Sequence, residues 1–531
     1  MSYSRENKDP ESVTPVVVTT QQMQAVEAAI FAEGMPVAAL MEKVAGRASR
    51  WIMERFPRDR TPIVGVIVGP GHNGGDALVI VRELHHCGYQ ILLWCPFSQT
   101  KDLTAQHKAY AEYLGVCSIN AVEELEACHL IIDGAFGLGL TRPLTGNLAT
   151  GIRQLNEYRL PVVSIDLPSG LESNTGEVLG IAIKATHTLC LGLWKLGLLQ
   201  DRAQPWVGEC HLLPFDVPLA ALQTVLADQS PRHCLTATAA IARLPLPRSP
   251  IAHKYTAGHA LLIVGSRQYA GAALLAAQGA IASGVGMLTV VVPESLRLMV
   301  VSQLPEALVI GASETPSGAI AALPEDWTWD RYDVVACGPG LTAAATPVVE
   351  AALQSDRPLV LDADGLNILA QTDPERQLKM RTAATLLTPH VGEFRRLFPQ
   401  QWQTAESPSL AASQAAIAAN CTLILKGAIS AIAAADGQLW FNTASSAGLA
   451  RGGSGDVLTG LVTGIAAQLE HRATHHSPLL DAAIAAVWWH GQTGRAMAAQ
   501  STVLGCNASA LAQQLPSVLA HQLQLQSNST A

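Results

Sequence analysis

The chain has few charged residues and no paired cysteine motif, and both absences narrow its function. Charged residues make up 15% of its 531 residues, its formal net charge is −9, and the basic residues form no cluster. Because nucleic-acid-binding proteins normally carry a basic patch, nucleic acid is not an expected partner. Ten cysteines are scattered between Cys87 and Cys506 without a CxxC pair. This spacing favours reduced thiols over a disulfide framework or a zinc site.

Long apolar runs are also absent. No uninterrupted apolar run approaches the roughly 20 residues that a membrane-spanning helix needs, and alanine accounts for the slightly positive mean hydropathy of +0.23. Residues 1–15 are polar and lack the apolar core of a signal peptide. The sequence therefore predicts a cytoplasmic protein without a membrane partner.

What the sequence does contain is an alternation of short β-branched runs and helical patterns. This alternation predicts a parallel sheet with helices on both faces. The continuous apolar run at residues 63–68 suits a strand that is buried on both sides. Strands are expected at residues 63–68, 91–95, 130–133, 162–166 and 187–191, and helices at 76–87 and 104–114.

Six prolines between Pro214 and Pro250 interrupt the alternation and predict a linker. Because the chain is too long for one ordinary core, we expect two doubly wound α/β domains, residues 1–228 and residues 229–531. The tail at residues 522–531 is expected to be frayed. Further strands are expected at residues 260–264, 288–292, 334–337, 359–361, 385–387, 423–425 and 431–434, and helices at 272–283 and 457–468.

The most informative segment is the glycine-rich stretch at residues 450–460, which contains four glycines and Asp456. Glycines let consecutive N–H groups turn inward, and the following helix adds the positive end of its dipole, so the segment suits a phosphate. Asp456 is placed to take a proton from a substrate hydroxyl that faces this phosphate. The alternative is a glycine-rich helix entry in which Asp456 is a simple first-turn cap.

Polar residues also follow three strands of the first half. The loop 69–76 follows one strand and precedes a helix, but it lacks the GxGxxG spacing of dehydrogenases. Asp133 and Asp166 end two further strands. Since ligands gather at the carboxyl edge of parallel sheets, these residues predict a binding site there. The alternative is that both aspartates only cap turns.

The segments GPGHNGGDAL, DGAFGLGLTRPLTG and DLPSGLESNTGEV resemble the signature segments of the NAD(P)H-hydrate epimerase family, over residues 19–214. The chain departs from the family pattern at His72 and Ala77. The resemblance implies a Rossmann-like three-layer sandwich in which Asp166 transfers a proton. Lys195 matches a family lysine, although a solvated surface lysine is an equally good interpretation. The implied contacts with the hydrated nucleotide are His72, Asn73, Gly74, Gly75, Asp76, Gly137, Leu138, Gly139, Leu140, Thr141, Arg142, Pro143 and Asp166, and the implied potassium ligands are Asn73, Asp133 and Ser169.

The second half contains YDVVACGPGL, LDADGLN, LTPHVGE and LILKGAIS before the Gly-Gly-Ser-Gly-Asp segment, and this series resembles the ribokinase-like superfamily. Over residues 253–519 it is similar to the ADP-dependent NAD(P)H-hydrate dehydratase family. His490 is interpreted as structural. The implied nucleotide contacts are Lys426, Gly427, Ala428, Ile429, Ser430 and Gly455, and the implied substrate contacts are Ala273, Gly340, His390 and Asp456. Magnesium would accompany the ADP, with Asp362, Asp364 or Glu393 as candidate anchors.

Together the two resemblances imply a repair enzyme for hydrated NADH and NADPH. The first domain would interconvert the R and S hydrates, and the second would dehydrate the S hydrate while converting ADP to AMP and phosphate. One alternative is a ribokinase-like vitamin or sugar kinase with a non-catalytic N-terminal binding module. Another is an N-terminal scaffold for protein or RNA, which would not need the polar site. Both families commonly assemble, so a homo-oligomer is expected.

Overall fold

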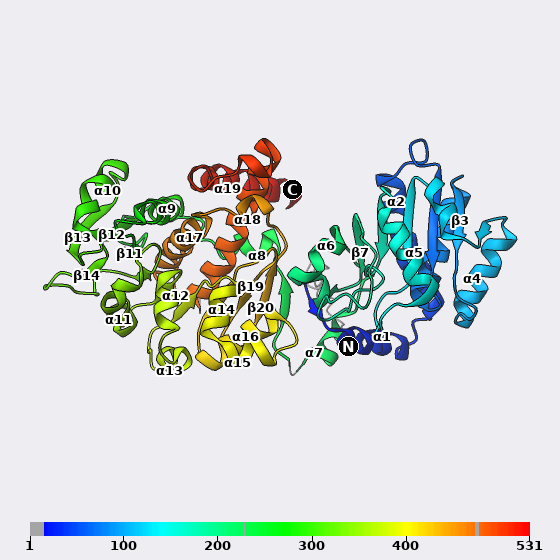
Figure 1. Cartoon of the computed structure of the whole chain (residues 1–531), viewed down its shortest axis with the longest axis horizontal. Helices are drawn as coiled ribbons and strands as arrows, with labels where there is room; N and C mark the ends of the chain where they lie inside the picture. The colour runs from blue at the N-terminus through cyan, green and yellow to red at the C-terminus, as the bar shows by residue number, and fades with distance from the viewer. Residues whose placement is uncertain (1–14, 228, 473–476, 531) are drawn as a thin grey trace, which may run out of the picture. The chain divides into compact units, whose positions relative to one another are not determined.

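The computed structural model describes residues 15–227, 229–472 and 477–530. The chain divides into two compact units, Met1–Arg232 and His233–Ala531. Figure 1 shows helices on both faces of the sheet in each unit. The predicted fold class of two doubly wound α/β domains is confirmed.

The N-terminal unit is built on a seven-stranded sheet whose paired strands all run parallel. A separate parallel pair joins β1 (Val17–Val18) to β8 (Trp194–Lys195). The sheet order is β4 (Cys117–Ile119), β3 (Gln90–Trp94), β2 (Ile63–Val68), β5 (Leu130–Gly134), β6 (Val162–Ile165), β7 (His187–Leu191) and β9 (Glu209–Leu213). The helices are α1 (Thr20–Ala32), α2 (Val37–Arg55), α3 (His72–His86), α4 (Asp102–Tyr113), α5 (Gly146–Glu157), α6 (Gln204–Val207) and α7 (Leu219–Leu226).

The side chains of β2 alternate between the two faces of the sheet, and helices cover both faces, which gives three layers. Val64, Val66 and Val68 join the apolar cluster formed with α1, α2 and α3. Ile67 joins a second cluster with residues of α5. Because successive side chains of a strand point to opposite faces, a run of apolar residues buries both faces of the sheet.

The first glycine-rich segment differs from the expected loop, because α3 begins at His72 rather than at Asp76. Only Gly69, Pro70 and Gly71 separate β2 from this helix. A Cβ on Gly69 would lie 1.6 Å from the carbonyl oxygen of Ala135, so glycine lets the loop cross the end of β5 closely. The polar residues that follow are therefore held on the first helical turn.

The C-terminal unit contains an eleven-stranded sheet with a parallel centre. The pairs of β13 with β14, β18 with β19 and β19 with β20 are antiparallel. The order is β10 (Arg232–Cys234), β20 (Leu439–Asn442), β19 (Ser430–Ala433), β18 (Thr422–Leu425), β17 (Thr385–Leu387), β16 (Leu359–Leu361), β15 (Val334–Cys337), β11 (His259–Ile263), β12 (Met287–Pro293), β13 (Leu308–Glu314) and β14 (Ile320–Ala322). The helices are α8 (Ala237–Ile241), α9 (Ala270–Ala282), α10 (Arg297–Gln303), α11 (Thr346–Gln354), α12 (Asp364–Leu369), α13 (Pro374–Lys379), α14 (Val391–Leu397), α15 (Pro399–Thr404), α16 (Pro408–Ala419), α17 (Ser454–Leu469), α18 (Pro478–Gly505) and α19 (Ala508–Thr530).

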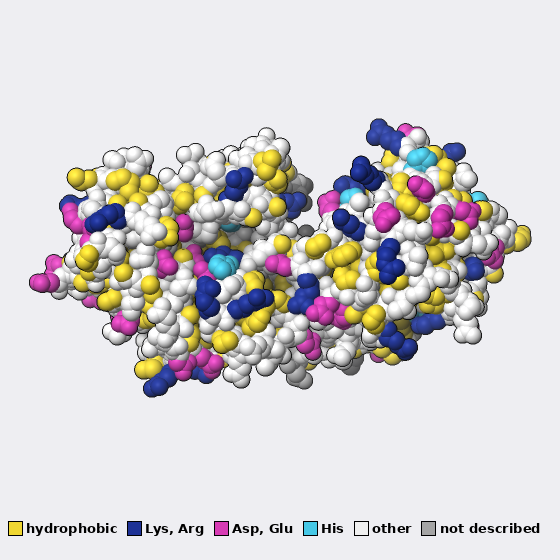
Figure 2. All heavy atoms as spheres, in the orientation of Figure 1, with side chains coloured by type: hydrophobic (Ala, Val, Ile, Leu, Met, Phe, Trp, Pro, Cys, Tyr) yellow, Lys and Arg dark blue, Asp and Glu magenta, His cyan; other side chains and the backbone are white. Residues whose placement is uncertain are grey.

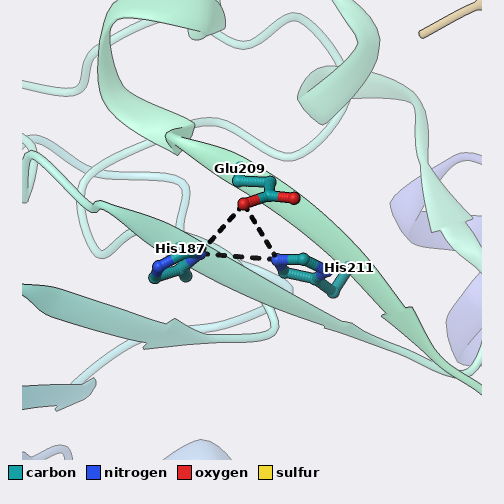
Figure 3. A group of neighbouring side chains, drawn as sticks. All are labelled: His187, Glu209 and His211. Atoms are coloured by element: carbon teal, nitrogen blue, oxygen red, sulfur yellow. Dashed lines mark hydrogen bonds and ion pairs between the residues drawn. The ribbon is translucent and has the colours of Figure 1, made fainter. Parts of the chain in front are cut away.

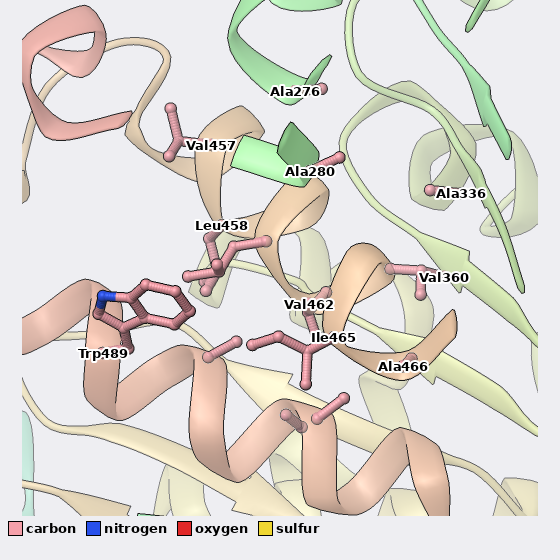
Figure 4. Packing of buried hydrophobic residues seen from close by; sticks show 14 of the residues in the cluster. Ala276, Ala280, Ala336, Val360, Val457, Leu458, Val462, Ile465, Ala466 and Trp489 are labelled. Carbon is pink, nitrogen blue, oxygen red and sulfur yellow. The ribbon is translucent and has the colours of Figure 1, made fainter. Parts of the chain in front are cut away.

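Helix α17 is buried along nearly its whole length, and Figure 4 shows its apolar side chains packed between neighbouring helices. Its contact with α9 depends on glycine. A Cβ on Gly460 would lie 1.7 Å from the carbonyl oxygen of Ala276, and a Cβ on Gly279 would lie 2.2 Å from that of Val457. The two backbones therefore touch, which fixes the position of the amino end of α17.

The predicted linker contains the division between the two units, but it also contains the short elements β10, α7 and α8, because its prolines lie between these elements or at their starts. The predicted frayed tail is helical through residue 530, as part of α19, while residue 531 lies outside the described residues. No helix in the described part of the chain is both long and apolar enough to cross a membrane.

We expect Gly460→Ala to destabilise the protein by about 3 kcal/mol or more, because the new methyl group overlaps the backbone of α9. Chemical unfolding of the full chain measures this loss. Gly271→Ala is the matched control, since it lies in α9 and a Cβ there meets nothing within 4 Å. Equal stability of the two variants would contradict the close helix contact.

Candidate active sites

A pocket of about 410 Å³ lies in the N-terminal unit, where loops leave the carboxyl ends of β2, β5, β6 and β7. Helices α1 and α2 supply further walls through side chains such as Gln24, Glu27 and Met41. The predicted site residues that line it are His72, Asn73, Asp76, Gly137, Leu138 and Asp166. The remaining predicted contacts lie outside its lining: Gly74 and Gly75 are buried in α3, while Gly139, Leu140, Thr141, Arg142 and Pro143 continue past the pocket wall.

Asp166 and Lys195 form a buried ion pair at this pocket. Lys195 Nζ lies 2.5 Å from Asp166 Oδ1 and also donates to the carbonyl oxygen of Leu191. Lys195 is 1% exposed, so its interpretation as a solvated surface residue was wrong. Asp166 has φ +69°, in the left-handed region that non-glycine residues rarely adopt, which turns its carboxylate back toward β7.

Two further carboxyl groups face this pair. Burial raises the pKa of Asp76 well above its ordinary value, and the charges of Asp166 and Glu27 raise it further. Burial also raises the pKa of Glu27, although Lys195 opposes that shift. The pocket therefore combines an ion pair with carboxyl groups that hold a proton more readily than in water.

Sequence reasoning missed Glu27. The signal that could have revealed it is a carboxylate on the apolar face of a helix, because Glu27 is four residues after the buried Met23 and three before the buried Ile30. A glutamate in that position is unusual unless it faces a cavity or a partner.

The potassium ligands implied by the resemblance lie beside the pocket. Asp133 is fully buried and accepts hydrogen bonds from the N–H groups of Ala135 and Ser169 and from the hydroxyls of Ser164 and Ser169. Asn73 Nδ2 is buried without a hydrogen-bond partner among the described residues. A 180° turn of that amide would place its oxygen there instead, where a cation would satisfy it. Carboxylate, hydroxyl and amide oxygens fit the requirements of a hard cation.

The C-terminal unit holds a second buried ion pair, between Asp362 after β16 and Lys426 after β18. Lys426 Nζ lies 2.8 Å from Asp362 Oδ1, and Thr459 of α17 donates to Asp362 Oδ2 at 2.7 Å. Burial alone would raise the pKa of Asp362, but Lys426 and the hydrogen bonds hold it below the ordinary value. The carboxylate therefore stays charged and fixes the lysine.

Asp456 lies in the first turn of α17, next to this pair. Burial raises its pKa to about 6, and the charges of Asp362 and Asp364 add to the shift while Lys426 opposes it. Gly453, with φ +88°, is the N-cap of the helix, and a Cβ on Gly455 would lie 3.4 Å from Lys426 Nζ. The arrangement places a carboxyl group that titrates near neutral pH at a helix amino end.

His390, which caps α14, and Glu393, which lies within it, flank Lys426. The backbone of Lys426 pairs with that of His390, and its N–H donates to the carbonyl oxygen of Pro389. His390 Nδ1 accepts from the N–H of Gly392, while Glu393 Oε2 accepts from the N–H of His390. The His390 side chain is 57% exposed, so this histidine is available at the surface of the site rather than packed in the core.

The other predicted contacts of this unit are positioned by tight backbone packing. Gly340 has φ +69°, and a Cβ there would lie 2.9 Å from the carbonyl oxygen of Tyr269. Ala273 is fully buried in the first turn of α9. Gly427, Ala428 and Ile429 form the turn from β18 to Ser430 at the start of β19. Figure 2 shows a hollow on one face of this unit, bordered by acidic, basic and histidine side chains.

The candidate magnesium anchors differ in availability. Both carboxylate oxygens of Asp362 already accept hydrogen bonds from Lys426 and Thr459. Asp364 Oδ2 accepts from the N–H of Thr342 at 2.9 Å. Burial raises the pKa of Glu393, although Lys426 opposes the shift. Carboxylate oxygens suit magnesium, and half-buried Asp364 is more accessible than Glu393, which is buried as Asp362 is.

His490 of α18 lies behind the glycine-rich turn rather than in the site. Its Nε2 lies 3.0 Å from the carbonyl oxygen of Ser454, and burial lowers its pKa to about 4. A neutral imidazole that donates to the first turn of α17 has a positioning role.

The comparisons with known proteins cover both units. Residues 37–197 match the family described as YjeF-related protein N-terminus, and residues 260–517 match the NAD(P)H-hydrate dehydratase family. A bifunctional NAD(P)H-hydrate repair enzyme of Thermosynechococcus vestitus is 51% identical over 491 residues, or 92% of this chain and 95% of the relative. Another, from Synechocystis sp., is 48% identical over 500 residues, or 94% of each chain.

A solved structure is similar to about half of the chain. The ADP/ATP-dependent NAD(P)H-hydrate dehydratase of Bacillus subtilis, co-crystallised with ATP and Mg²⁺, is 32% identical and covers 54% of this chain and 97% of its own, with a TM-score of 0.45. Fold, sites and relatives together define a two-unit α/β enzyme. The chain belongs to the family of bifunctional NAD(P)H-hydrate repair enzymes.

We expect Asp456→Asn to be more stable than the wild type above pH 6, by about 1–3 kcal/mol. A carboxyl group whose pKa rises from 3.8 to about 6 on folding makes the folded state less stable once it ionises. The advantage of the variant should therefore disappear as the pH falls from 6 to 4. Free energies of unfolding of the variant and the wild type at pH 4, 5, 6 and 8 measure this difference in stability. The exposed Asp326→Asn variant is the control. A difference in unfolding free energy that is the same at every pH would contradict the raised pKa of Asp456.

Proposed function

We propose that this chain repairs hydrated NADH and NADPH, with an epimerase site in the N-terminal unit and a nucleotide-dependent dehydratase site in the C-terminal unit. The observation that supports it most directly is that each half brings a buried lysine–carboxylate pair to the carboxyl edge of its own parallel sheet. Our assignment of residues 1–228 and 229–531 to the two activities is part of this proposal.

In the epimerase step, the reacting carbon carries a hydroxyl group and is bonded to the ring nitrogen. Asp166 takes the hydroxyl proton, the oxygen forms a carbonyl as the carbon–nitrogen bond breaks, and the ring nitrogen keeps the bonding pair and gains a proton. Closure on the other face, with the reverse proton movement, gives the other epimer. Lys195 holds the Asp166 carboxylate in place, and Asp76, with its raised pKa, supplies a protonated carboxyl group beside it.

Potassium is part of the proposal for this unit. Asn73, Asp133 and Ser169 would hold the ion, which would supply a fixed positive charge near the nucleotide phosphate. The buried, unpartnered amide of Asn73 supports this assignment. His72 and Gly137 line the adjoining pocket, where they would contact the hydrated nucleotide.

In the dehydratase step, the substrate hydroxyl oxygen bonds to the terminal phosphorus of ADP. The bond from that phosphorus to the oxygen bridging the two phosphates breaks, and AMP leaves. Asp456 takes the hydroxyl proton, and its pKa of about 6 suits a base at neutral pH. The N–H groups at the start of α17 stabilise the charge on the transferring phosphoryl group. The ring nitrogen lone pair then expels phosphate, and a proton leaves the neighbouring ring carbon.

Other residues of the second site would bind the two substrates. Lys426, Gly427, Ala428, Ile429, Ser430 and Gly455 would contact ADP, and Ala273, Gly340 and His390 would contact the hydrated nucleotide. Magnesium bound near Asp364 and Glu393 would neutralise phosphate charge. Asp362 would act through Lys426, whose ammonium it fixes.

The kinase alternative receives no support from the first half of the chain. A non-catalytic binding module would not need a buried Asp166–Lys195 pair, which is costly to bury without a function. The full-length relatives in two organisms are also named as bifunctional repair enzymes.

Absorbance of reduced nicotinamide, followed with a mixture of both NADH-hydrate epimers, ADP and Mg²⁺, tests the proposal. We expect complete recovery with the wild type. Asp166→Asn should stop at the fraction that was initially the S epimer, because the R epimer is no longer supplied. Asp456→Asn should slow recovery by at least about 100-fold, because the base is lost.

The exposed carboxylates Asp59 and Asp326 provide the matched Asp→Asn controls for the two units, and both variants should behave as wild type. The same mixture is also tested with ATP. No absorbance increase with either nucleotide would reject the dehydratase assignment and favour a small-molecule kinase.

Replacing potassium with a large organic cation should slow epimerisation several-fold in the wild type, because the charge near the phosphate is lost. Asn73→Ala should show little further response to the replacement. The rate of epimerisation, measured on the purified R epimer with excess dehydratase, provides the readout. A wild-type rate that is independent of the cation would contradict the potassium assignment.

A further inference from the structure

Three side chains converge on one face of the N-terminal sheet, away from the pocket. His187 begins β7, and Glu209 and His211 lie on β9, which ends the strand order of this sheet. Figure 3 shows all three pointing toward one another. The strand register aligns His187 with Glu209, and the period of two along β9 places Glu209 and His211 on the same face. The backbone therefore fixes this arrangement.

The ligand atoms have the spacing of a metal site. His187 Nδ1 and His211 Nε2 are 3.4 Å apart, and Glu209 Oε2 lies 3.7 Å and 3.8 Å from them. The nearest point equidistant from these three atoms, in their plane, lies about 2.1 Å from each, close to the zinc–nitrogen and zinc–oxygen bond lengths of about 2.0–2.2 Å. Among the residues that the structure describes, no other group of three potential ligands is this close.

We propose that His187, Glu209 and His211 bind one divalent transition-metal ion, with zinc as the best match. Two imidazoles and a carboxylate favour zinc over magnesium or calcium, which prefer oxygen ligands alone. Three protein ligands leave a fourth position for water. Cysteine takes no part, so the site is separate from the scattered thiols.

The surroundings hold the imidazoles in position. The Trp51 ring lies 5.3 Å from that of His187 and 4.8 Å from that of His211, and the Phe56 ring lies 5.9 Å from that of His187. Both histidines are mostly buried beneath these rings.

Arg55 is the competing cation. Its Nη2 lies 3.2 Å from Glu209 Oε2, the same oxygen that would bind the metal. Arg55 and Glu209 side chains are 49% and 55% exposed, so the pair can separate at little cost. Metal binding therefore requires that Arg55 release this oxygen.

The position of the site indicates a structural role. His187 is at the amino end of β7, whereas Leu191, at its carboxyl end, lines the epimerase pocket. A metal here would join the outermost strand β9 to β7. The chain continues from β9 to Phe215, which also lines the pocket, so the metal would stabilise that wall without contacting substrate.

Metal-free full-length protein, prepared by dialysis against a chelator, is titrated with Zn²⁺ in competition with a chromophoric chelator. We expect one ion per chain at this site and a higher unfolding temperature with Zn²⁺. His211→Ala should weaken binding by more than the ~10–100-fold that follows loss of a residue supporting a metal ligand. Glu209→Gln, at an exposed position that cannot disturb the core, should also weaken it.

Two further measurements identify the site. Co²⁺ should give the visible absorption of a four-coordinate ion without a sulfur charge-transfer band. Arg55→Gln should tighten Zn²⁺ binding by up to about fivefold, the effect expected for removing one exposed charge pair. The double variant His85→Ala/His86→Ala, which removes two neighbouring histidines from the end of α3, should bind as the wild type does.

Zn²⁺ affinity that is unchanged in both His211→Ala and Glu209→Gln would overturn the proposal. A sulfur charge-transfer band in the Co²⁺ spectrum that is unchanged in His211→Ala would also overturn the proposal, because it would place the metal on cysteine. Circular dichroism of the metal-free variants separates loss of binding from loss of folding.

Discussion

A charged carboxylate cannot be buried alone, and in both units one lysine makes its burial possible. Removing a carboxylate from water costs several kcal/mol, which an adjacent ammonium and good hydrogen bonds offset. Lys195 has this role for Asp166 and Lys426 has it for Asp362. The pKa values of Asp76 and Asp456 are raised mainly by burial, and the pairs adjust them, because Asp166 and Asp362 raise them further while Lys195 and Lys426 oppose the shift.

Close backbone contacts then determine where these pairs can lie. Gly69 lets the loop after β2 pass across β5, so that α3 carries Asn73 and Asp76 to the pocket. In the other unit, Gly460 lets α17 touch α9, and α17 delivers Asp456 and the Thr459 hydroxyl to the same place. In both units, therefore, a close contact at glycine places the amino end of a helix at the carboxyl edge of a parallel sheet.

Much of the fold could be predicted from the sequence, because buried parallel strands are continuous apolar runs and ligand-binding residues follow them, as with Asp133 and Asp166. Local patterns could not predict what depends on distant packing. The burial of Lys195 is decided by its contact with Asp166, 29 residues away, and Glu27 reaches the pocket only because α1 packs over it. His187 and His211 become neighbours through strand register, which no sequence spacing encodes.

The pairing of β1 with β8 has a consequence for synthesis of the chain. Val18 lies opposite Lys195, so β1 can pair only after a strand 177 residues later has been synthesised. Contacts of such large sequence separation form late and slow folding. Because α1 follows β1 directly and carries Glu27, we expect the α1 wall of the first pocket to close only after β8 has left the ribosome.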